Sequence, residues 1–86
     1  MFIILAYDIN QKRVGKVLKI CRKYLTHTQK SVFEGSITEK KLERLKSELK
    51  GVIDTGEDAI CIYSMLSLQN MSKEQIGVVE DHSHII

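Results

Sequence analysis

The stretch Phe2-Ile3-Ile4-Leu5-Ala6-Tyr7-Asp8 decides the fold of this chain. It is a continuous apolar run with β-branched and aromatic members, closed by a single acid. A run of this length indicates a strand buried on both faces, because a half-exposed strand would alternate apolar and polar residues. Asn10 follows at once and has the side chain of a helix N-cap. The sequence therefore predicts a buried strand that leads directly into a helix.

The period of the pattern changes after Asn10. One set of apolar residues recurs at helical spacing and falls on one side of a helical wheel: Val14, Val17, Leu18, Cys21, Tyr24 and Leu25. Lysines spaced four, three and four residues apart form the opposite stripe, about 16 Å long at ~1.5 Å per residue: Lys12, Lys16, Lys19 and Lys23. We expect an amphipathic helix with a basic outer face.

Two strands and a second helix are predicted next. Residues 28–37 are strand-like, and Gly35 marks a bend or bulge, so we expect a hairpin-like pair. Thr38 is a plausible N-cap for a helix over 39–50 with Leu42, Leu45 and Leu49 as its apolar stripe. Gly51 stands where a left-handed C-terminal stop is expected.

The last third of the chain is harder to divide. Residues 57–63 contain a second strand that is apolar on both faces. Residues 64–74 have the mixed composition of a loop, and a last short strand is predicted over 75–79. The polar residues that follow form a tail, which we place at 81–86 after a single domain over 1–80.

This order of elements predicts an α+β fold, the ferredoxin-like βαββαβ sandwich with an extra C-terminal strand. Two short helices can cover only one face of its sheet, yet the strands at 2–8 and 57–63 are apolar on both faces. An uncovered apolar face would be a larger patch than monomers usually expose. We therefore predict a homodimer in which sheet packs on sheet.

Composition narrows the class of protein. With 86 residues, 43% of them apolar, 28% charged and none proline, the chain is typical of one globular domain and not of a disordered segment. Two cysteines are too few for a disulfide-stapled secreted scaffold. The first apolar run is too short to span a bilayer and lacks the basic start of a signal peptide. We expect a cytoplasmic protein with no membrane partner.

The charges are distributed unevenly. Residues 9–33 carry seven basic residues and no acidic one, whereas residues 34–86 carry six basic and ten acidic residues. Such asymmetry suggests a polyanion partner for the first third of the chain, although most basic stripes are simply solvated helix faces. The candidate nucleic-acid-binding residues are Lys12, Arg13, Lys16, Lys19, Arg22 and Lys23.

Asp8 is the main candidate for chemistry. By strand parity it shares a face with Ile4 and Ala6 at the carboxyl end of a buried strand, where acids are uncommon. It could simply end the strand or help to cap the helix. Alternatively, a two-fold axis could bring two Asp8 carboxylates together, and two carboxylates with waters and phosphate oxygens suit Mg²⁺. Such a metal could activate water against a phosphodiester.

Other candidates are weaker. Ser31 lacks the glycine-flanked turn of an activated nucleophile. His82 and His84 could form a ligand pair, but solvated or partner-bound imidazoles are commoner in a tail, and their role stays open. His27 lies beside the basic helix and could add charge toward a phosphate at lower pH. Cys21 and Cys61 fit apolar stripes and are expected in the core.

Several motifs together resemble a known family. The strand ending in Tyr7-Asp8-Ile9, the basic helix, and the segment Thr28-Gln29-Lys30-Ser31-Val32-Phe33-Glu34 are similar to the small CRISPR-associated spacer-acquisition proteins, the second of the universal Cas proteins. The resemblance covers nearly the whole chain, including the Glu57-Asp58 turn. It implies a ferredoxin-like dimer that acts as a Mg²⁺-dependent endonuclease on single-stranded RNA or double-stranded DNA. It also implies a central dimer that bridges two copies of the CRISPR integrase.

The resemblance also assigns residues. Asp8 matches the metal-binding acid that each subunit contributes, Tyr7 and Phe33 match the aromatic residues that flank it, and Ser31 lies in the matching motif. Arg13 takes the place of an arginine near the site. Two basic positions of the family are filled here by Gln11 and His27, which leaves fewer cations to stabilise phosphoryl charge.

Two hypotheses therefore stand. One is a metal-dependent phosphodiesterase centred on a pair of Asp8 carboxylates. The other is a non-catalytic scaffold that holds duplex DNA by its backbone while the sheet edge or the tail docks the integrase. A toxin-type ribonuclease on the same fold is a more distant alternative.

Overall fold

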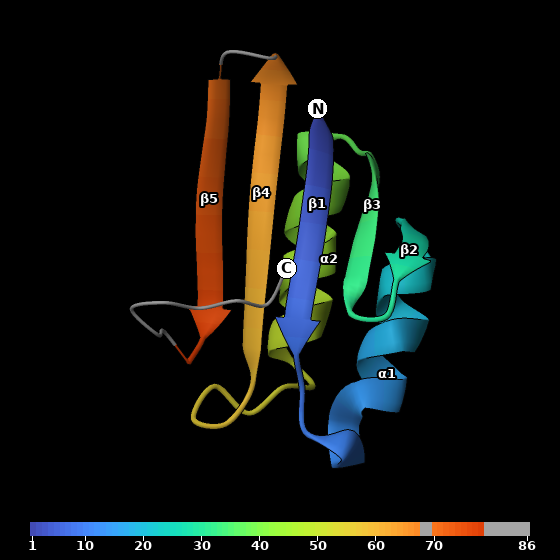
Figure 1. Ribbon diagram of the computed structural model, residues 1–86, viewed down its shortest axis with the longest axis vertical. Helices are drawn as coiled ribbons and strands as arrows, with labels where there is room; N and C mark the ends of the chain where they lie inside the picture. Colours follow the sequence, from blue (N-terminus) through green and yellow to red (C-terminus); the bar gives the residue numbers. More distant parts are fainter. Residues whose placement is uncertain (68–69, 79–86) are drawn as a thin grey trace.

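The computed structural model describes residues 1–67 and 70–78. The predicted tail with His82 and His84, and the last residue of the strand expected over 75–79, lie outside the described residues. Within these described residues, seven elements follow one another (Figure 1): β1 (Phe2–Asp8), α1 (Gln11–Arg22), β2 (Thr26–Gln29), β3 (Val32–Ser36), α2 (Glu39–Lys50), β4 (Ala59–Ser67) and β5 (Asn70–Gly77).

The strands form one sheet in the order β2-β3-β1-β4-β5, and every neighbouring pair is antiparallel. Both helices lie on the same side of this sheet, so that β1 passes in front of α2 in Figure 1. The order places β3 between β1 and β2, as a split βαβ unit requires, and adds β5 outside β4. The predicted α+β class and the expected extra C-terminal strand are confirmed.

The hydrophobic core lies between the sheet and the helices. From β1 it takes Ile3, Leu5 and Tyr7, which alternate along the strand and therefore share a face. The helices contribute the stripes that their periodicity predicts, with Val17 and Cys21 from α1 and a second set from α2: Leu42, Leu45 and Leu49. The remaining residues of β1 must point to the opposite face of the sheet.

Both helices begin where the sequence predicts. The Asn10 side chain accepts a hydrogen bond from the backbone N–H of Lys12 at 2.9 Å, and the Thr38 hydroxyl accepts one from the N–H of Lys41 at 3.2 Å. These caps satisfy donors that a helix start leaves unpaired. The expectation for Gly51 was wrong, because its φ of −76° is right-handed. The chain continues from there in a further turn and needs no left-handed residue.

The β2–β3 hairpin is confirmed, with two differences. It begins at Thr26, earlier than predicted, and the irregularity in its register falls between His27 and Gln29. Gly35, the expected site of a bulge, stays in register opposite Ile3. The extra residue is therefore absorbed in β2, the edge strand, where a disrupted ladder breaks no second pairing.

The prediction of a loop over 64–74 was wrong. β4 runs on to Ser67 and β5 starts at Asn70, so the two form one long hairpin. The side chains of residues 70–74 in β5 are exposed, so no apolar alternation marks this part of the strand in the sequence. The backbone hydrogen bonds of an edge strand need no buried side chains, and this is why hydrophobic patterning found only the end of β5, within the strand predicted over 75–79.

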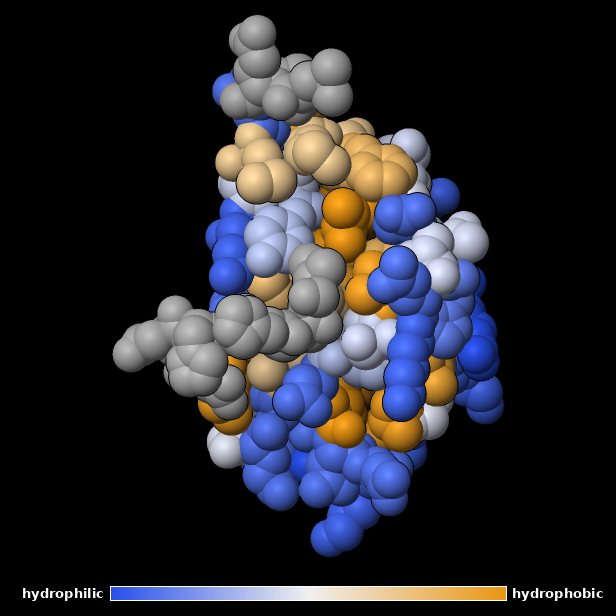
Figure 2. All heavy atoms as spheres, viewed as in Figure 1, coloured by the Kyte–Doolittle hydropathy of each residue, from blue (hydrophilic) through white to orange (hydrophobic). Residues whose placement is uncertain are grey.

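The sheet face opposite the helices is largely apolar. Phe2, Ile4, Tyr63 and Met65 point to this face and are half-buried in one chain. Figure 2 views this face and shows apolar side chains gathered along its middle. The idea that a second copy of the chain covers this sheet face stays a prediction. Within the described ranges, no helix is long and apolar enough to cross a membrane.

Candidate functional site at the end of the first strand

Asp8 ends β1 with an exposed side chain. It pairs with Ala59 across the ladder and, by alternation from Tyr7, points to the face that the helices leave open. Among residues 1–67 and 70–78, no side chain or backbone group forms a hydrogen bond or ion pair with its carboxylate. The sequence-based placement of Asp8 on the same face as Ile4 and Ala6 agrees with this register. An exposed acid at the end of a buried strand is available to bind a ligand.

Tyr7 and Phe33 lie together, but on the helix side of the sheet. Their ring centroids are 6.2 Å apart and both residues are buried. The Tyr7 hydroxyl donates to the carbonyl of Lys30 at 3.0 Å, and its backbone N–H donates to the carbonyl of Ser31 at 3.0 Å. Burial raises the pKa of Tyr7, so the phenol stays a donor. The structure thus brings three of the predicted residues together, with both rings on the side away from Asp8.

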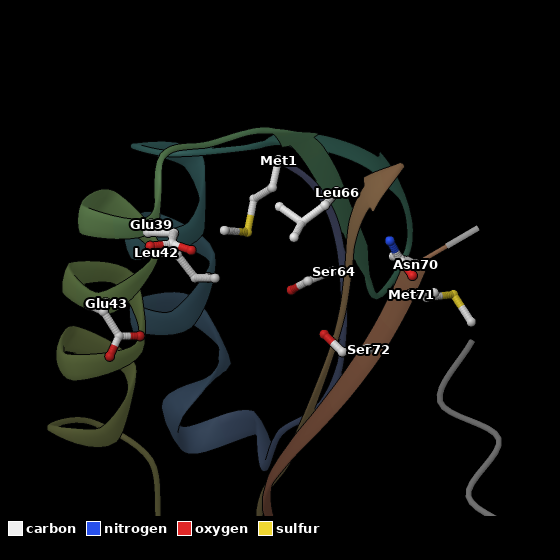
Figure 3. Close-up of a pocket in the computed structure, with 9 residues that line it drawn as sticks. All are labelled: Met1, Glu39, Leu42, Glu43, Ser64, Leu66, Asn70, Met71 and Ser72. Atoms are coloured by element: carbon white, nitrogen blue, oxygen red, sulfur yellow. The ribbon is translucent and has the colours of Figure 1, made fainter. Parts of the chain in front are cut away.

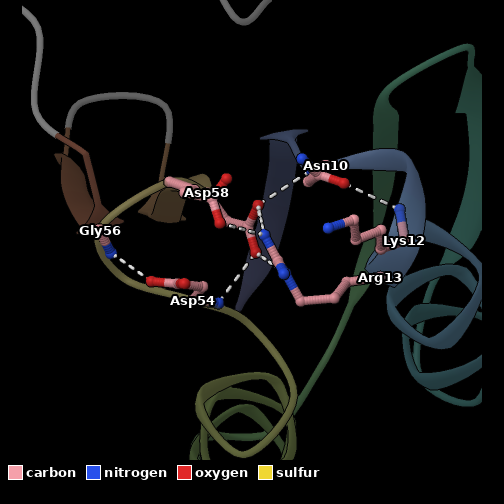
Figure 4. A network of polar contacts seen from close by, with 7 residues as sticks. Asn10, Lys12, Arg13, Asp54, Gly56 and Asp58 are labelled. Carbon is pink, nitrogen blue, oxygen red and sulfur yellow. Dashed lines mark hydrogen bonds and ion pairs between the residues drawn. The ribbon is translucent and has the colours of Figure 1, made fainter.

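The polar centre of this end of the molecule is Asp58, which is not among the site residues that the sequence predicts. Its side chain is fully buried. It accepts four hydrogen bonds (Figure 4), from the backbone N–H groups of Asn10 and Asp54 at 2.9 Å each and from Arg13 Nε and Nη2 at 2.6 and 3.2 Å. The hydrogen bond from Arg13, and then those from the backbone, outweigh desolvation and lower the pKa of Asp58 to about 2. Asp58 is therefore an ionised carboxylate whose oxygens are occupied by these four hydrogen bonds.

This network joins three parts of the chain. Asp58 holds the corner between β1 and α1 through Asn10 and Arg13, and it directly precedes β4. Gly77 packs against the same place, with a φ of +96° and so little room that an added Cβ would stand 2.0 Å from the Asp58 carbonyl oxygen. The only sequence signal for this arrangement was an acid directly before an apolar strand, and such acids are common at strand starts.

The six predicted nucleic-acid-binding residues divide into two groups. Arg13 is committed to Asp58 and to Glu57, and its pKa lies above the usual range of an arginine because of these carboxylates. Lys23 forms an ion pair with Glu48 of α2, which raises the pKa of the lysine. The other four are exposed, and no ion pair within the described part of the chain occupies them: Lys12, Lys16, Lys19 and Arg22.

The structure also shows where His27 and the two cysteines lie. The His27 ring stacks on Phe33 at a centroid distance of 4.4 Å, and its Nε2 lies 3.2 Å from the Lys30 carbonyl oxygen. Cys21 and Cys61 are buried free thiols, as predicted, and burial raises the pKa of Cys21 to about 12. Neither thiol is accessible as a nucleophile.

A cavity of about 480 Å³ lies at the other end of the sheet (Figure 3). It opens between α2 and the β4–β5 hairpin, beside Met1, which precedes the start of β1. Two carboxylates line it, those of Glu39 and Glu43. Because Asp8 closes the opposite end of β1, this cavity is separate from the candidate site, and its acidic lining is unfavourable for a phosphate.

The groups around Asp8 limit which metal it could bind. No group of three or more histidine, cysteine, aspartate or glutamate side chains that could hold an ion occurs among the described residues. Within the described ranges, Asp8 therefore belongs to no ready-made metal-binding group of one chain. Mg²⁺ is commonly held by only one or two carboxylates together with waters and substrate phosphates. The residues thus fit Mg²⁺ only if a second carboxylate or a substrate completes the site.

Comparison with known proteins places the chain. Residues 1–73 match the family described as CRISPR associated protein Cas2. The chain is 46% identical over 78 residues to the CRISPR-associated endoribonuclease Cas2 of Thermotoga maritima, a match that covers 91% of this chain and 90% of that protein. It is 40% identical over 78 residues to the protein of the same name from Pyrococcus furiosus, covering 91% and 89% of the two chains.

Solved structures agree with the sequence comparison. The crystal structure of Streptococcus pyogenes Cas2 is similar with a TM-score of 0.70 and 34% identity, over 76% of this chain and 86% of that one. Another crystal structure of a Cas2 protein gives a TM-score of 0.71 at 29% identity and covers 100% of this chain and 97% of that chain. Fold and sequence therefore point to the same family.

Proposed function

The chain belongs to the Cas2 family of CRISPR-associated proteins, and on that premise we propose that it is a Mg²⁺-dependent endonuclease of the spacer-acquisition machinery. Its substrate is single-stranded RNA or double-stranded DNA. It works as a ferredoxin-like homodimer in the cytoplasm and is a subunit of the complex that contains the CRISPR integrase. The names of the relatives, which are endoribonucleases, support the nuclease part of this proposal.

The observation that carries the proposal is the contrast between Asp8 and the surface around it. Asp8 is exposed and closes a strand whose neighbours on the same face, Ile4 and Ala6, are apolar. An acid that only improves solubility can lie in any exposed loop and does not need a position beside an apolar surface. A carboxylate at the edge of an apolar surface is well placed to meet a second copy of itself across a two-fold axis.

Mg²⁺ bound between two such carboxylates would activate water and offset charge on the phosphodiester. Residues of the chain itself would bind the metal, bind the substrate and hold Asp8 in position. Asp8 supplies the ligand, and the exposed Lys12, in the first turn of α1, supplies a cation for the substrate backbone. Arg13, bound to Asp58, holds the corner between β1 and α1 and so fixes where Asp8 stands.

The dimer is supported by the open sheet face. Phe2, Ile4, Tyr63 and Met65 leave part of their apolar surface exposed in one chain. Burial of such surface stabilises association by about 25 cal/mol per Å² before the cost of immobilising two chains. The order of the four strands β2-β3-β1-β4 supports the ferredoxin-like designation.

Cleavage by Asp8→Asn tests the proposal. The variant removes the charge that binds the metal and keeps the shape, so it should lose cleavage of single-stranded RNA in Mg²⁺ by at least about a hundredfold. Its mass in solution should remain that of a dimer. Glu57→Gln is the matched control, since it neutralises another exposed carboxylate at the same end of the molecule. If Asp8→Asn cleaves as fast as the wild type, the catalytic proposal is wrong.

A second candidate function rests on the exposed lysines alone. Lys12, Lys16 and Lys19 follow one face of α1 and are suited to sequence-independent contacts with a DNA backbone. A protein that only bridges DNA between integrase subunits needs these charges and not Asp8. Charge reversal at the three lysines should then abolish spacer capture in cells, while Asp8→Asn should leave it intact. Normal capture by the charge-reversed protein would contradict this candidate.

A further inference from the structure

A second, smaller cavity lies on the helix side of the molecule. It has a volume of about 270 Å³ and is lined by Ile20 and three lysines of α1 and by Val52, which follows α2. Ile20 and Val52 are half-buried and pack against the hydrophobic core. The floor of this slot is therefore aliphatic and fixed in place by the packing of the two helices.

The rim of the slot is cationic. Its three lysines are Lys16, Lys19 and Lys23. Lys23 is paired with Glu48, whereas Lys16 and Lys19 are exposed and, within the described part of the chain, carry no ion pair. Residues three apart lie one above the other on a helix face. The slot thus keeps two adjacent ammonium groups, one helical turn apart, that are available to a ligand.

The chemistry of the slot selects its ligand. An aliphatic floor favours an apolar or flat group, and two neighbouring cations favour a group that carries negative charge on either side. An unpaired nucleotide within a strand has both features, because its base is flat and its flanking phosphates are charged. A base pair inside a duplex cannot reach such a floor, since its faces are already stacked. The larger cavity beside Glu39 and Glu43 lacks the cations.

We propose that this slot receives the base of an unpaired nucleotide, packed against Ile20 and Val52, while Lys16 and Lys19 bind the phosphates on its two sides. The inference rests on the proposed function, because it assumes that α1 meets nucleic acid. It adds a preference for single-stranded or splayed segments, which backbone contacts alone do not provide.

The test compares two fluorescent probes of equal length and charge, an oligothymidylate and the same backbone with abasic sites. The wild-type protein should bind the oligothymidylate roughly five- to tenfold more tightly, since each base held on a protein surface adds to affinity. Val52→Ser removes part of the apolar floor and no charge, so this preference should shrink to within about twofold. Ile53→Ser is the matched control, because Ile53 is also half-buried but does not line the slot. Denaturant unfolding of both variants checks that they fold.

Three results would overturn the inference. Equal affinity of the wild type for the two probes would show that the lysines bind phosphate only, and the nucleic-acid role of α1 would stand. A preference that survives in Val52→Ser would place the base elsewhere. Displacement of the oligothymidylate by an oligoglutamate peptide at equal charge concentration would show a general anion site. No binding of either probe would instead contradict the nucleic-acid contact of α1 in the proposed function itself.

Discussion

Asp8 and Asp58 lie at the same end of the sheet and have opposite surroundings. Asp8 ends β1 and is exposed, and its carboxylate has no polar partner within the described ranges. Asp58 comes directly before β4, the strand that pairs with β1, and is fully buried under four hydrogen bonds. Two carboxylates of similar intrinsic chemistry, one ending β1 and the other directly preceding β4, thus differ in what they contact: Asp58 is enclosed by donors of the fold, and Asp8 faces solvent.

The difference shows how burial separates structure from function. A buried carboxylate is stable only when donors surround it, and once surrounded it cannot bind anything else. An exposed carboxylate contributes little to folding and stays free for a ligand. The same division applies to the cations, since Arg13 is committed to Asp58 and Lys12 is exposed.

The largest expected difference is in stability. Asp58→Ala leaves the N–H groups of Asn10 and Asp54 and the Arg13 guanidinium without their acceptor. We expect the free energy of unfolding to fall by about 4 kcal/mol. Asp8→Ala should change it by less than about 0.5 kcal/mol. Urea denaturation of both variants measures the free energy of unfolding. Equal losses would show that the exposed and the buried carboxylate contribute equally to stability.

Gly77→Ala tests the packing around Asp58 without touching its charge. The added Cβ would stand 2.0 Å from the Asp58 carbonyl oxygen, and a φ of +96° is strained for alanine. The free energy of unfolding should decrease by about 3 kcal/mol. Thermal denaturation checks this, with Gly15→Ala as the control, since nothing lies within 4 Å of a Cβ at Gly15. Equal melting temperatures for the two variants would mean that β5 does not pack against Asp58 in solution.

The pH dependence of stability sharpens the comparison. The pKa of Asp58 is lowered from 3.8 to about 2 in the folded protein, so its ionised form stabilises the fold above pH ~4. This contribution is lost as the pH falls from about 4 to about 2, and it amounts to about 2 kcal/mol. The stability difference between the wild type and Asp58→Asn should therefore shrink over that interval. Unfolding measured at pH 5, 4, 3 and 2 would reveal it, and a constant difference would contradict it.

The smallest effect is expected at Glu57, which forms the outer half of the same network. Its side chain is 56% exposed, and it contacts Arg13 at 3.2 Å. An exposed ion pair contributes little because water screens it. Glu57→Gln should lower the melting temperature by less than about 2 °C. A shift as large as that of Asp58→Ala would mean that Arg13 depends on both acids equally.

Local signals predicted most of the fold. The apolar run before Asp8, the caps at Asn10 and Thr38, and the helical stripes each have a direct physical cause within a few residues of sequence. The first part of β5, residues 70–74, gave no such signal, because its exposed residues pair through backbone atoms with β4. The position of the bulge was also missed, since it depends on how β2 fits against β3 and not on the glycine alone.

The placement of the candidate site residues was predictable only in part. Strand parity placed Asp8 on the correct face, because parity is fixed by the chain itself. The partnership of Arg13 with Asp58 was not predictable, since the two residues are 45 positions apart and meet only when β4 has paired with β1. Arg13 looked like one more cation of a basic helix, and only the folded structure separates it from Lys12.

A calorimetric Mg²⁺ titration tests the central claim most directly. If one ion is shared between the Asp8 carboxylates of two chains, the wild type should bind one Mg²⁺ for every two chains, and Asp8→Asn should bind none at that site. Binding by Asp8→Asn with the same heat and stoichiometry as the wild type would contradict the account, and so would a stoichiometry of one ion for each chain.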